Sequence, residues 1–357
     1  MKKALRILAL VLTTALMFSV VACAKKDTTT KIGVAMPTQD LQRWNQDGAN
    51  MKKQLEDAGY TVDLQYANND VATQVSQIEN MITGGCDVLV IASIDGNSLG
   101  TVLADAKAAK IPVIAYDRLI MNTDAVSYYA TFDNYMVGTI QGQYIEKTLD
   151  LKNTDKTFNI ELFAGSPDDN NARFFYQGAI DVLQPYIDSG KLVVVSGQTA
   201  FTDIAISGWK TDAAQARMDN LLTAFYATGK TLDVVLSPND SLALGIENSL
   251  DSTGSYVVGQ NWPIITGQDC DVANTKNIIA GKQSMSIFKD TRTLAAKVVE
   301  MVTAIVNGTT PAVNDTKTYN NGKLIVPSFL CVPVYADVTN YKAILVDSGY
   351  YTADQLA

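Results

Sequence analysis

Residues 86–118, CDVLVIASIDGNSLGTVLADAKAAKIPVIAYDR, decide the fold. Residues 88–92 and 111–116 are apolar runs of strand length that are rich in β-branched side chains. Between them, apolar residues recur at helical spacing from residue 99 to residue 106. Two apolar strands joined by a helix predict a parallel pair, because a parallel connection needs a crossover.

Polar side chains follow both of these strands. Asp95 comes after the first strand, and Asp117 and Arg118 come directly after the second. The carboxyl ends of parallel strands meet at one edge of a sheet, and open α/β sheets bind ligands in the crevice outside that edge. We therefore expect the three side chains at a ligand site.

The same alternation of strand and helix continues along the chain and begins again near residue 133. Further strands are expected at 31–36, 61–66, 128–132, 158–163, 192–196, 232–236 and 263–267. The strand at 128–132 is expected at an edge of its sheet. This pattern predicts an α/β protein with two doubly wound parallel sheets.

The length of the chain also indicates two lobes, because 357 residues exceed a single core of common size. The predicted N-terminal lobe comprises residues 31–132 plus 270–313. The predicted C-terminal lobe comprises residues 133–269 plus 314–357. The chain would then cross between the lobes about three times.

The first residues are predicted to lie outside the fold. Two lysines precede an apolar run that ends in Val20-Val21-Ala22-Cys23, which is the pattern of a signal peptide at residues 1–22. A cysteine in this position resembles the bacterial lipobox, so we expect lipidation at Cys23 and a tether at residues 23–30. The alternative is an uncleaved transmembrane anchor, because the run is almost long enough to span a bilayer. In both cases the folded part lies outside the cytoplasmic membrane.

The composition excludes several classes of function. A net charge of -9 disfavours nucleic acid and anionic membrane surfaces as partners. The absence of histidine excludes Ser-His-Asp and Cys-His catalysis and His-ligated metal sites. No dinucleotide, P-loop or nucleophile-elbow motif occurs, and the cluster at 168–171 lacks the EF-hand glycine and glutamate, so no cofactor or metal is expected. Cys86 is expected in the core, while a Cys270–Cys331 disulfide is left open.

The remaining polar side chains suit a neutral ligand that is rich in hydroxyl groups. Carboxylates accept hydrogen bonds, Arg and Lys donate them, and Asn does both. Trp44 and Trp209 are candidates for stacking on an apolar ring face, with core packing as the alternative. Any single Asp or Asn at a strand end has an alternative role as a turn residue or helix cap.

Motifs along the chain resemble periplasmic sugar-binding proteins of ABC importers, including multiple-monosaccharide receptors and xylose-binding proteins. The matching motifs include RWNQDG, QYANND, DVLVIASIDG, IPVIAYDR, GSPDDNNA, LSPND, GQD, IFKDT and NDTKTYNNG. The resemblance extends over residues 31–356 and implies a type I fold of two lobes joined by a three-stranded hinge. It implies a sugar held between the lobes by Arg43, Trp44, Asp117, Arg118, Asp169, Asn171, Trp209, Asn239, Asp269 and Lys289.

Asp95, in the sequence ASIDG, is added to this set because it follows a strand at the same sheet edge as Asp117 and Arg118. The xylose-specific form has a different loop there, so strict xylose specificity is not expected. The ligand is predicted to be a pentose or hexose such as xylose, glucose, galactose or arabinose. A monomeric, lipid-anchored protein would deliver it to an ABC transporter permease.

Three other functions are weighed against this prediction. A sugar receptor that docks on a chemoreceptor or sensor kinase is the first alternative. A sugar-responsive repressor is disfavoured by the signal peptide and by the lack of a basic DNA-binding module. A secreted glycosidase needs a paired acid and base with one raised pKa, whereas Arg118 beside Asp117 favours an ionised carboxylate. No enzymatic activity is therefore expected.

Overall fold

The structure is a computed structural model that describes residues 29–357. The predicted signal peptide and the predicted lipidation site at Cys23 lie outside the described residues. Among the described helices, none has the length and apolar character needed to cross a membrane.

A six-stranded sheet with the order β11-β5-β4-β3-β1-β2 is the centre of the first lobe. Its strands are β1 (Lys31–Met36), β2 (Thr61–Tyr66), β3 (Val88–Ile91), β4 (Val113–Tyr116), β5 (Val126–Phe132) and β11 (Ser328–Cys331). All neighbouring strands in this sheet are parallel. The pairing of β3 with β4 confirms the strand–helix–strand unit predicted for residues 86–118.

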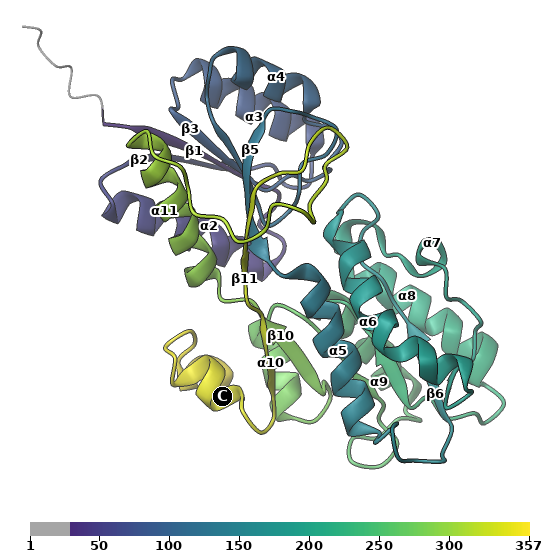
Figure 1. Cartoon of the computed structure of the whole chain (residues 1–357). Coiled ribbons are helices and arrows are strands. Elements are labelled where there is room, and N and C mark those ends of the chain that lie inside the picture. The colour runs from purple at the N-terminus through teal and green to yellow at the C-terminus, as the bar shows by residue number, and fades with distance from the viewer. Residues whose placement is uncertain (1–28) are drawn as a thin grey trace, which may run out of the picture. The chain divides into compact units, whose positions relative to one another are not determined.

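Helices cover both faces of this sheet (Figure 1). On one face lie α2 (Gln42–Asp57) and α11 (Thr291–Val306), whose buried residues share a hydrophobic cluster. On the other face lie α3 (Val71–Thr83) and α4 (Gly100–Ala108), which belong to a second cluster. Because both faces are covered, β3 and β4 are buried along their whole length, which explains their unbroken apolar sequences.

A four-stranded parallel sheet with the order β7-β6-β8-β9 is the centre of the second lobe. Its strands are β6 (Phe158–Leu162), β7 (Leu192–Val194), β8 (Val234–Leu236) and β9 (Ile264–Ile265). Its helices are α5 (Asn134–Thr148), α6 (Asn171–Asp188), α7 (Phe201–Ile204), η1 (Ser207–Trp209), α8 (Thr211–Leu221), η2 (Leu222–Tyr226), α9 (Asp240–Thr253) and α10 (Val272–Ile279). The α/β class with two parallel sheets is therefore confirmed.

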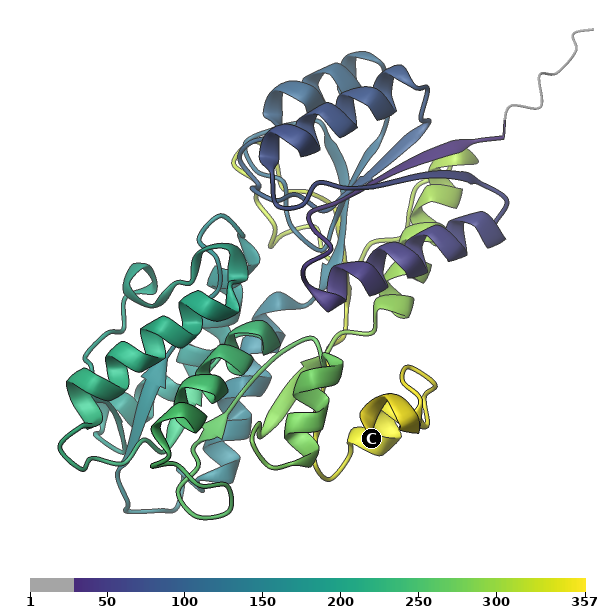
Figure 2. The same cartoon turned by 180° about the vertical axis from the view of Figure 1, so that it is seen from behind.

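The C-terminal part of the chain completes the second lobe. Strands β10 (Met285–Phe288) and β12 (Val334–Asp337) form an antiparallel pair, and a bridge between Gln268 and Ile287 joins this pair to the segment after β9. The chain ends in η3 (Lys342–Val346) and α12 (Ala353–Leu356), and both figures show this end beside α10 and β10 (Figures 1 and 2). Three segments connect the lobes: β5 to α5, β10 to α11, and β11 to β12.

Strand pairing differs from the sequence prediction in three places. β5 is not an edge strand, because β11 pairs outside it. β11 therefore lies in the first sheet, although residues 314–357 were assigned to the C-terminal lobe. Residues 270–288 lie with the second lobe, because α10 packs against α9 and β10 pairs with β12. A short apolar run identifies a strand but does not indicate which strand it pairs with.

The structure also settles whether Cys270 and Cys331 form a disulfide. Cys86, Cys270 and Cys331 are buried and free, so Cys270 and Cys331 do not form a disulfide. Cys86 packs in the cluster beneath α3 and α4, which confirms its expected place in the core.

Candidate functional site

A pocket lies at the carboxyl ends of strands from both sheets. Its walls come from the segments that follow β1, β4, β6, β8 and β9, together with η1 and the connection after β10. Its empty volume is about 420 Å³, which includes open solvent at the mouth. The lining residues are Leu41, Arg43, Trp44, Asp117, Arg118, Asp169, Asn171, Phe175, Trp209, Asn239, Ser241, Gln268, Asp269, Asp271 and Lys289.

All of the predicted site residues except Asp95 line this pocket. Asp95 instead uses its carboxylate within its own loop, where it accepts hydrogen bonds from the Asn97 backbone N–H and the Ser98 hydroxyl. The structure therefore corrects the assignment of Asp95 to the site: it is a turn residue, the alternative role for an Asp after a strand.

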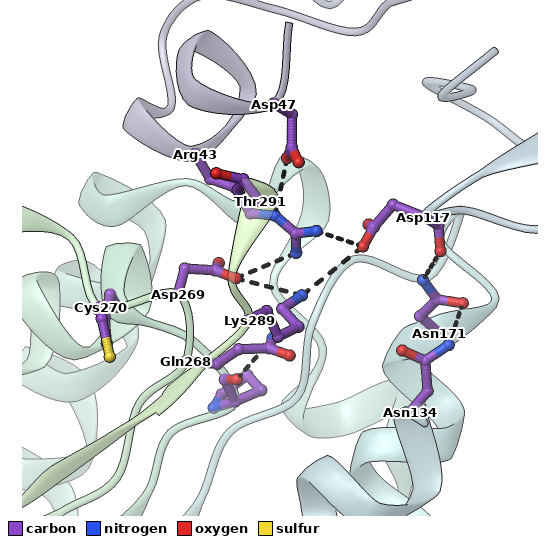
Figure 3. A network of polar contacts seen from close by, with 12 residues as sticks. Arg43, Asp47, Asp117, Asn134, Asn171, Gln268, Asp269, Cys270, Lys289 and Thr291 are labelled. Carbon is purple, nitrogen blue, oxygen red and sulfur yellow. Dashed lines mark hydrogen bonds and ion pairs between the residues drawn. The ribbon is translucent and has the colours of Figure 1, made fainter. Parts of the chain in front are cut away.

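Arg43 is the centre of the charged network in the pocket (Figure 3). Its Nε lies 3.0 Å from Asp47, its Nη2 lies 2.5 Å from Asp117, and its Nη1 lies 3.1 Å from Asp269. Lys289 adds an ion pair of 3.2 Å with Asp269 and a longer one of 3.8 Å with Asp117. Arg43 and Asp269 belong to different lobes, so the two cations join carboxylates across the pocket.

Burial and charge oppose each other in this network. Burial would lower the pKa of Arg43, but the carboxylates of Asp117, Asp47 and Asp269 raise it well above its ordinary value. Burial would likewise raise the pKa of Asp117, but Arg43, Lys289 and then Arg118 outweigh it and lower the pKa. Asp117 is therefore held as a carboxylate that can accept hydrogen bonds.

Asp47 is the third carboxyl group that Arg43 contacts, and its pKa is raised. Burial raises the pKa of Asp47 to about 6, although Arg43 opposes the shift. The Tyr116 hydroxyl donates to its Oδ1. Asp47 is fully buried and does not line the pocket. It acts on the pocket only through Arg43, which lies one helical turn earlier on α2.

Arg118 is fixed by the backbone and by an aromatic ring. Its Nη1 donates to the carbonyl oxygens of Ser93 and Ile94 at 3.1 Å each, and its Nε lies 3.1 Å from Asp169. Its guanidinium carbon lies 5.1 Å from the centre of the Trp44 ring. These contacts hold the planar group in one orientation while its Nη2 has no protein partner among the hydrogen bonds of residues 29–357.

Trp44 belongs to the core and also reaches the pocket, while its stacking on an apolar ring face stays a prediction. It is buried and packs in the cluster beneath α2 and α11, so the core role holds. It also lines the pocket, with the guanidinium carbons of Arg43 and Arg118 at 5.4 and 5.1 Å from its ring centre.

The start of α6 supplies Asp169 and Asn171. Asn171 donates from Nδ2 to the Asp117 carbonyl at 2.6 Å, and its Oδ1 accepts from Tyr129 and Asn134 at 3.0 Å each. Burial raises the pKa of Asp169, against the opposing charge of Arg118. Most of the Asn171 side chain is therefore committed to holding the backbone of Asp117 in place.

Left-handed backbone conformations occur at three residues that line the pocket. The φ angles are 57° at Asp117, 56° at Trp209 and 101° at Asp269. Such angles are unfavourable for a bulky residue like Trp209 and persist only where the surroundings fix them. Gly165 makes room for the Trp209 ring, because a Cβ at this position would lie 1.9 Å from it.

Some lining residues were not singled out from the sequence. They are Leu41, Phe175, Ser241, Gln268 and Asp271. The last two flank Asp269 in the sequence GQDCD, which was a usable signal, whereas Phe175 and Leu41 have ordinary apolar positions. Asn239 lines the pocket and also caps α9, because its Oδ1 accepts from the Leu242 N–H.

Asp271 adds a further carboxyl group to the wall. Burial and the charge of Asp269 raise the pKa of Asp271 to about 7. Behind it, Asp240 accepts from the Asp271 N–H at 2.9 Å and from Gln283 and Ser286 at 2.8 Å each. Burial and Asp271 raise the pKa of Asp240 well above its ordinary value.

The fold and the pocket define a class of two-lobed proteins that bind a ligand between lobes. The family model of the periplasmic binding protein domain matches residues 32–310, and the chain belongs to this family. Its fold is the type I fold of that family, as the similarity to solved sugar-binding structures also shows.

Individual relatives give a finer comparison. The multiple sugar-binding periplasmic receptor ChvE of Rhizobium radiobacter is 56% identical over 325 residues, which cover 91% of this chain and 92% of that protein. The D-xylose-binding periplasmic protein of Escherichia coli is 37% identical over 97% of this chain and 98% of its own length. A solute-binding protein of an ABC transporter from Clostridium phytofermentans, solved with bound β-D-glucose, is 66% identical with a TM-score of 0.89 and covers 92% of this chain and 100% of its own.

Proposed function

We propose that this protein is an extracytoplasmic substrate-binding protein that captures a neutral monosaccharide and delivers it to an ABC transporter permease. The observation that carries the proposal is the arrangement of Arg43, Asp117, Asp269 and Lys289, which places donors and acceptors from both lobes on one pocket. The relatives described as binding several sugars, xylose or glucose support a pentose or hexose as the ligand.

The mechanism follows from these ion pairs. Adjacent hydroxyl groups of a sugar accept from a cation and donate to a carboxylate, so they can enter between partners such as Arg43 and Asp269. Each such hydroxyl replaces a direct contact between lobes with a bridged one. Because ligand contacts to both lobes exist only when the lobes are close together, binding shifts the hinge equilibrium towards closure.

The cations around Asp117 argue against this residue as the acid of a glycosidase. A glycosidase needs one carboxyl group with a raised pKa positioned as an acid and a second as base or nucleophile. The pKa of Asp117 is lowered by the cations around it. The carboxyl group of Asp47 has a raised pKa but lies behind Arg43, outside the pocket lining. Asp169 and Asp271 do line the pocket and have raised pKa values, so the aryl glycoside assay described below decides whether the pocket hydrolyses its ligand.

Calorimetry of the purified full chain against D-glucose, D-galactose, D-xylose, L-arabinose and D-ribose tests the proposal. At least one sugar should bind with a defined stoichiometry of one, and D-glucuronate serves as a charged control. An absence of binding to the whole panel would overturn the sugar-binding function. Turnover of an aryl glycoside would overturn the assignment as a binding protein without enzymatic activity.

The proposal includes lipid attachment at Cys23, supported by the sequence around it, and a monomeric state. Sensory docking on a chemoreceptor or sensor kinase is the second candidate, because one relative is named a receptor. Pull-down of the permease with the sugar-loaded protein, compared with a sensor kinase ectodomain, distinguishes the two roles.

A further inference from the structure

The C-terminal segment reaches α2 at a point directly behind the pocket. The Tyr351 hydroxyl accepts from Nε2 of Gln42 at 2.7 Å and from Nε2 of Gln46 at 3.1 Å. It donates to the Cys270 carbonyl at 2.8 Å. One hydroxyl group with one donated and two accepted hydrogen bonds has all of its capacity in use.

These contacts join the two chain segments that supply opposite walls of the pocket. Gln42 precedes Arg43 on α2, and its Oε1 accepts from the Val272 N–H at 3.1 Å. Cys270 follows Asp269, the carboxylate that pairs with Arg43. Gln42 and Cys270 are therefore the sequence neighbours of Arg43 and Asp269, which form the ion pair between the lobes.

Tyr350 adds a parallel set of contacts. Its hydroxyl donates to Oε1 of Gln46 at 3.1 Å and lies 3.1 Å from the Thr291 hydroxyl. Its ring lies edge-on to Phe288 and to Tyr351, with centres 4.7 and 4.8 Å apart. The two tyrosines thus bridge α2 to the second lobe, and we name them the tyrosine bridge.

The tyrosine bridge is anchored on the second lobe by apolar packing. Tyr351 is 4% exposed and shares a cluster with Cys270, Phe288, Leu345 and Leu356. The contacts to α2 are polar, and hydrogen bonds of this kind can break and re-form without exposing a core. Apolar packing on the second lobe and hydrogen bonds to α2 suit an element that stays with the second lobe when the lobes separate.

We infer that the tyrosine bridge positions Arg43 against Asp269 and favours the approach of the two lobes, so that Tyr351 sets ligand affinity without touching the ligand. This inference rests on the proposed function for its affinity part. Tyr351 lies outside the pocket lining and is a positioning residue. It also helps to fix Asp269 and Cys270, whose φ angles of 101° and 54° need support from the surroundings.

The test compares Tyr351→Phe with Tyr341→Phe in the purified full chain. Both changes remove one hydroxyl from the same C-terminal cluster, but the Tyr341 hydroxyl makes no hydrogen bond within residues 29–357. With D-glucose as the probe, Tyr351→Phe should raise the Kd roughly three- to tenfold, mainly through faster dissociation, because the hydrogen bonds from Gln42 and Gln46 between the lobes are lost. Tyr341→Phe should leave the Kd unchanged.

A second readout needs no sugar. Small-angle scattering of the ligand-free chain should give a larger radius of gyration for Tyr351→Phe than for Tyr341→Phe. A lower melting temperature with an unchanged radius and Kd would assign the hydroxyl to fold stability alone and overturn the inference. If the unmodified chain bound none of the panel sugars, the proposed function would fail, and the radius of gyration would still decide the role of the tyrosine bridge.

Discussion

Replacement of Arg43 by lysine keeps the charge but removes the planar fork. Arg43 contacts three carboxylates through three different nitrogen atoms, whereas a lysine has a single ammonium group. One or two charge-assisted hydrogen bonds are then lost, each of which contributes about 1.5–3 kcal/mol. We expect the free energy of unfolding at pH 7.5 to fall by about 2–5 kcal/mol, and the Kd for D-glucose to rise roughly ten- to a hundredfold.

The pH dependence of this loss is a sharper test. Asp47 has a folded-state pKa of about 6, raised by burial and held down by Arg43, so the variant should raise it further. When folding raises the pKa of a carboxyl group, the protein becomes less stable as the pH rises from the ordinary pKa of that group through its pKa in the folded state. Above pH 6 the contribution of Asp47 to the free energy of unfolding continues to fall only in the variant, by up to about 1.4 kcal/mol per pH unit, while the other buried carboxyl groups affect both proteins equally. The gap between the two proteins should therefore be wider at pH 7.5 than at pH 5.

Urea unfolding at both pH values, with calorimetry at pH 7.5, measures these quantities. Arg173→Lys is a suitable control, because Arg173 is exposed and its guanidinium contacts the ring of Phe201 rather than a carboxylate network. An Arg43→Lys variant with the stability and Kd of the Arg173→Lys control would refute the reasoning. The reasoning would also fail if the difference in free energy of unfolding between the unmodified protein and Arg43→Lys became smaller as the pH rises.

Three further predictions concern other parts of the chain. Trp44→Phe should reduce the fluorescence change on titration with D-glucose and weaken binding several-fold, whereas Trp262→Phe, outside the pocket lining, should leave both unchanged; the reverse pattern would contradict the stacking role. Glu247 is buried, its Oε1 has no hydrogen-bond partner within residues 29–357, and burial raises its pKa to about 8. Its contribution to the free energy of unfolding therefore falls as the pH rises from 4.5 to 8, and Glu247→Gln should remove about 4–5 kcal/mol of that decline in urea unfolding. Parallel pH profiles of the two proteins would show the shift to be absent. Cys23→Ala should release the protein from the membrane fraction, and an unchanged distribution with no acyl mass on the N-terminus would exclude lipid attachment.

The fold was largely predictable because its central strands β1, β3 and β4 are buried apolar runs and β2 alternates apolar and polar residues. Strands 31–36 and 61–66 match β1 and β2 to the residue, since continuous or alternating apolar runs mark strands directly. The strands with which β11 and β12 pair were not predictable in the same way. Both are short, and their partners depend on long-range contacts with β5 and β10 that no local pattern encodes.

The site was predictable to the extent that it lies at strand ends. Asp117 and Arg118 follow β4 directly and Asp269 lies in the segment after β9, so the sheets themselves bring these residues to the pocket. Asp95 has the same kind of position but turns back on its own loop, and only side-chain orientation separates the two cases. Asp47 was missed because a carboxylate inside a helix has no distinctive local signal, although its spacing of four residues from Arg43 is that of a helical ion pair.

The way the chain ends has a practical consequence for protein engineering. Leu356 is 6% exposed and packs in the cluster with Tyr351, and Thr352 and Gln355 form a capping box at the start of α12. An affinity tag or fluorescent protein fused directly after Ala357 would begin one residue after a buried side chain. A reporter of sugar binding is better inserted in the exposed turn around Gly229, where an added Cβ would meet no atom beyond its chain neighbours within 4 Å.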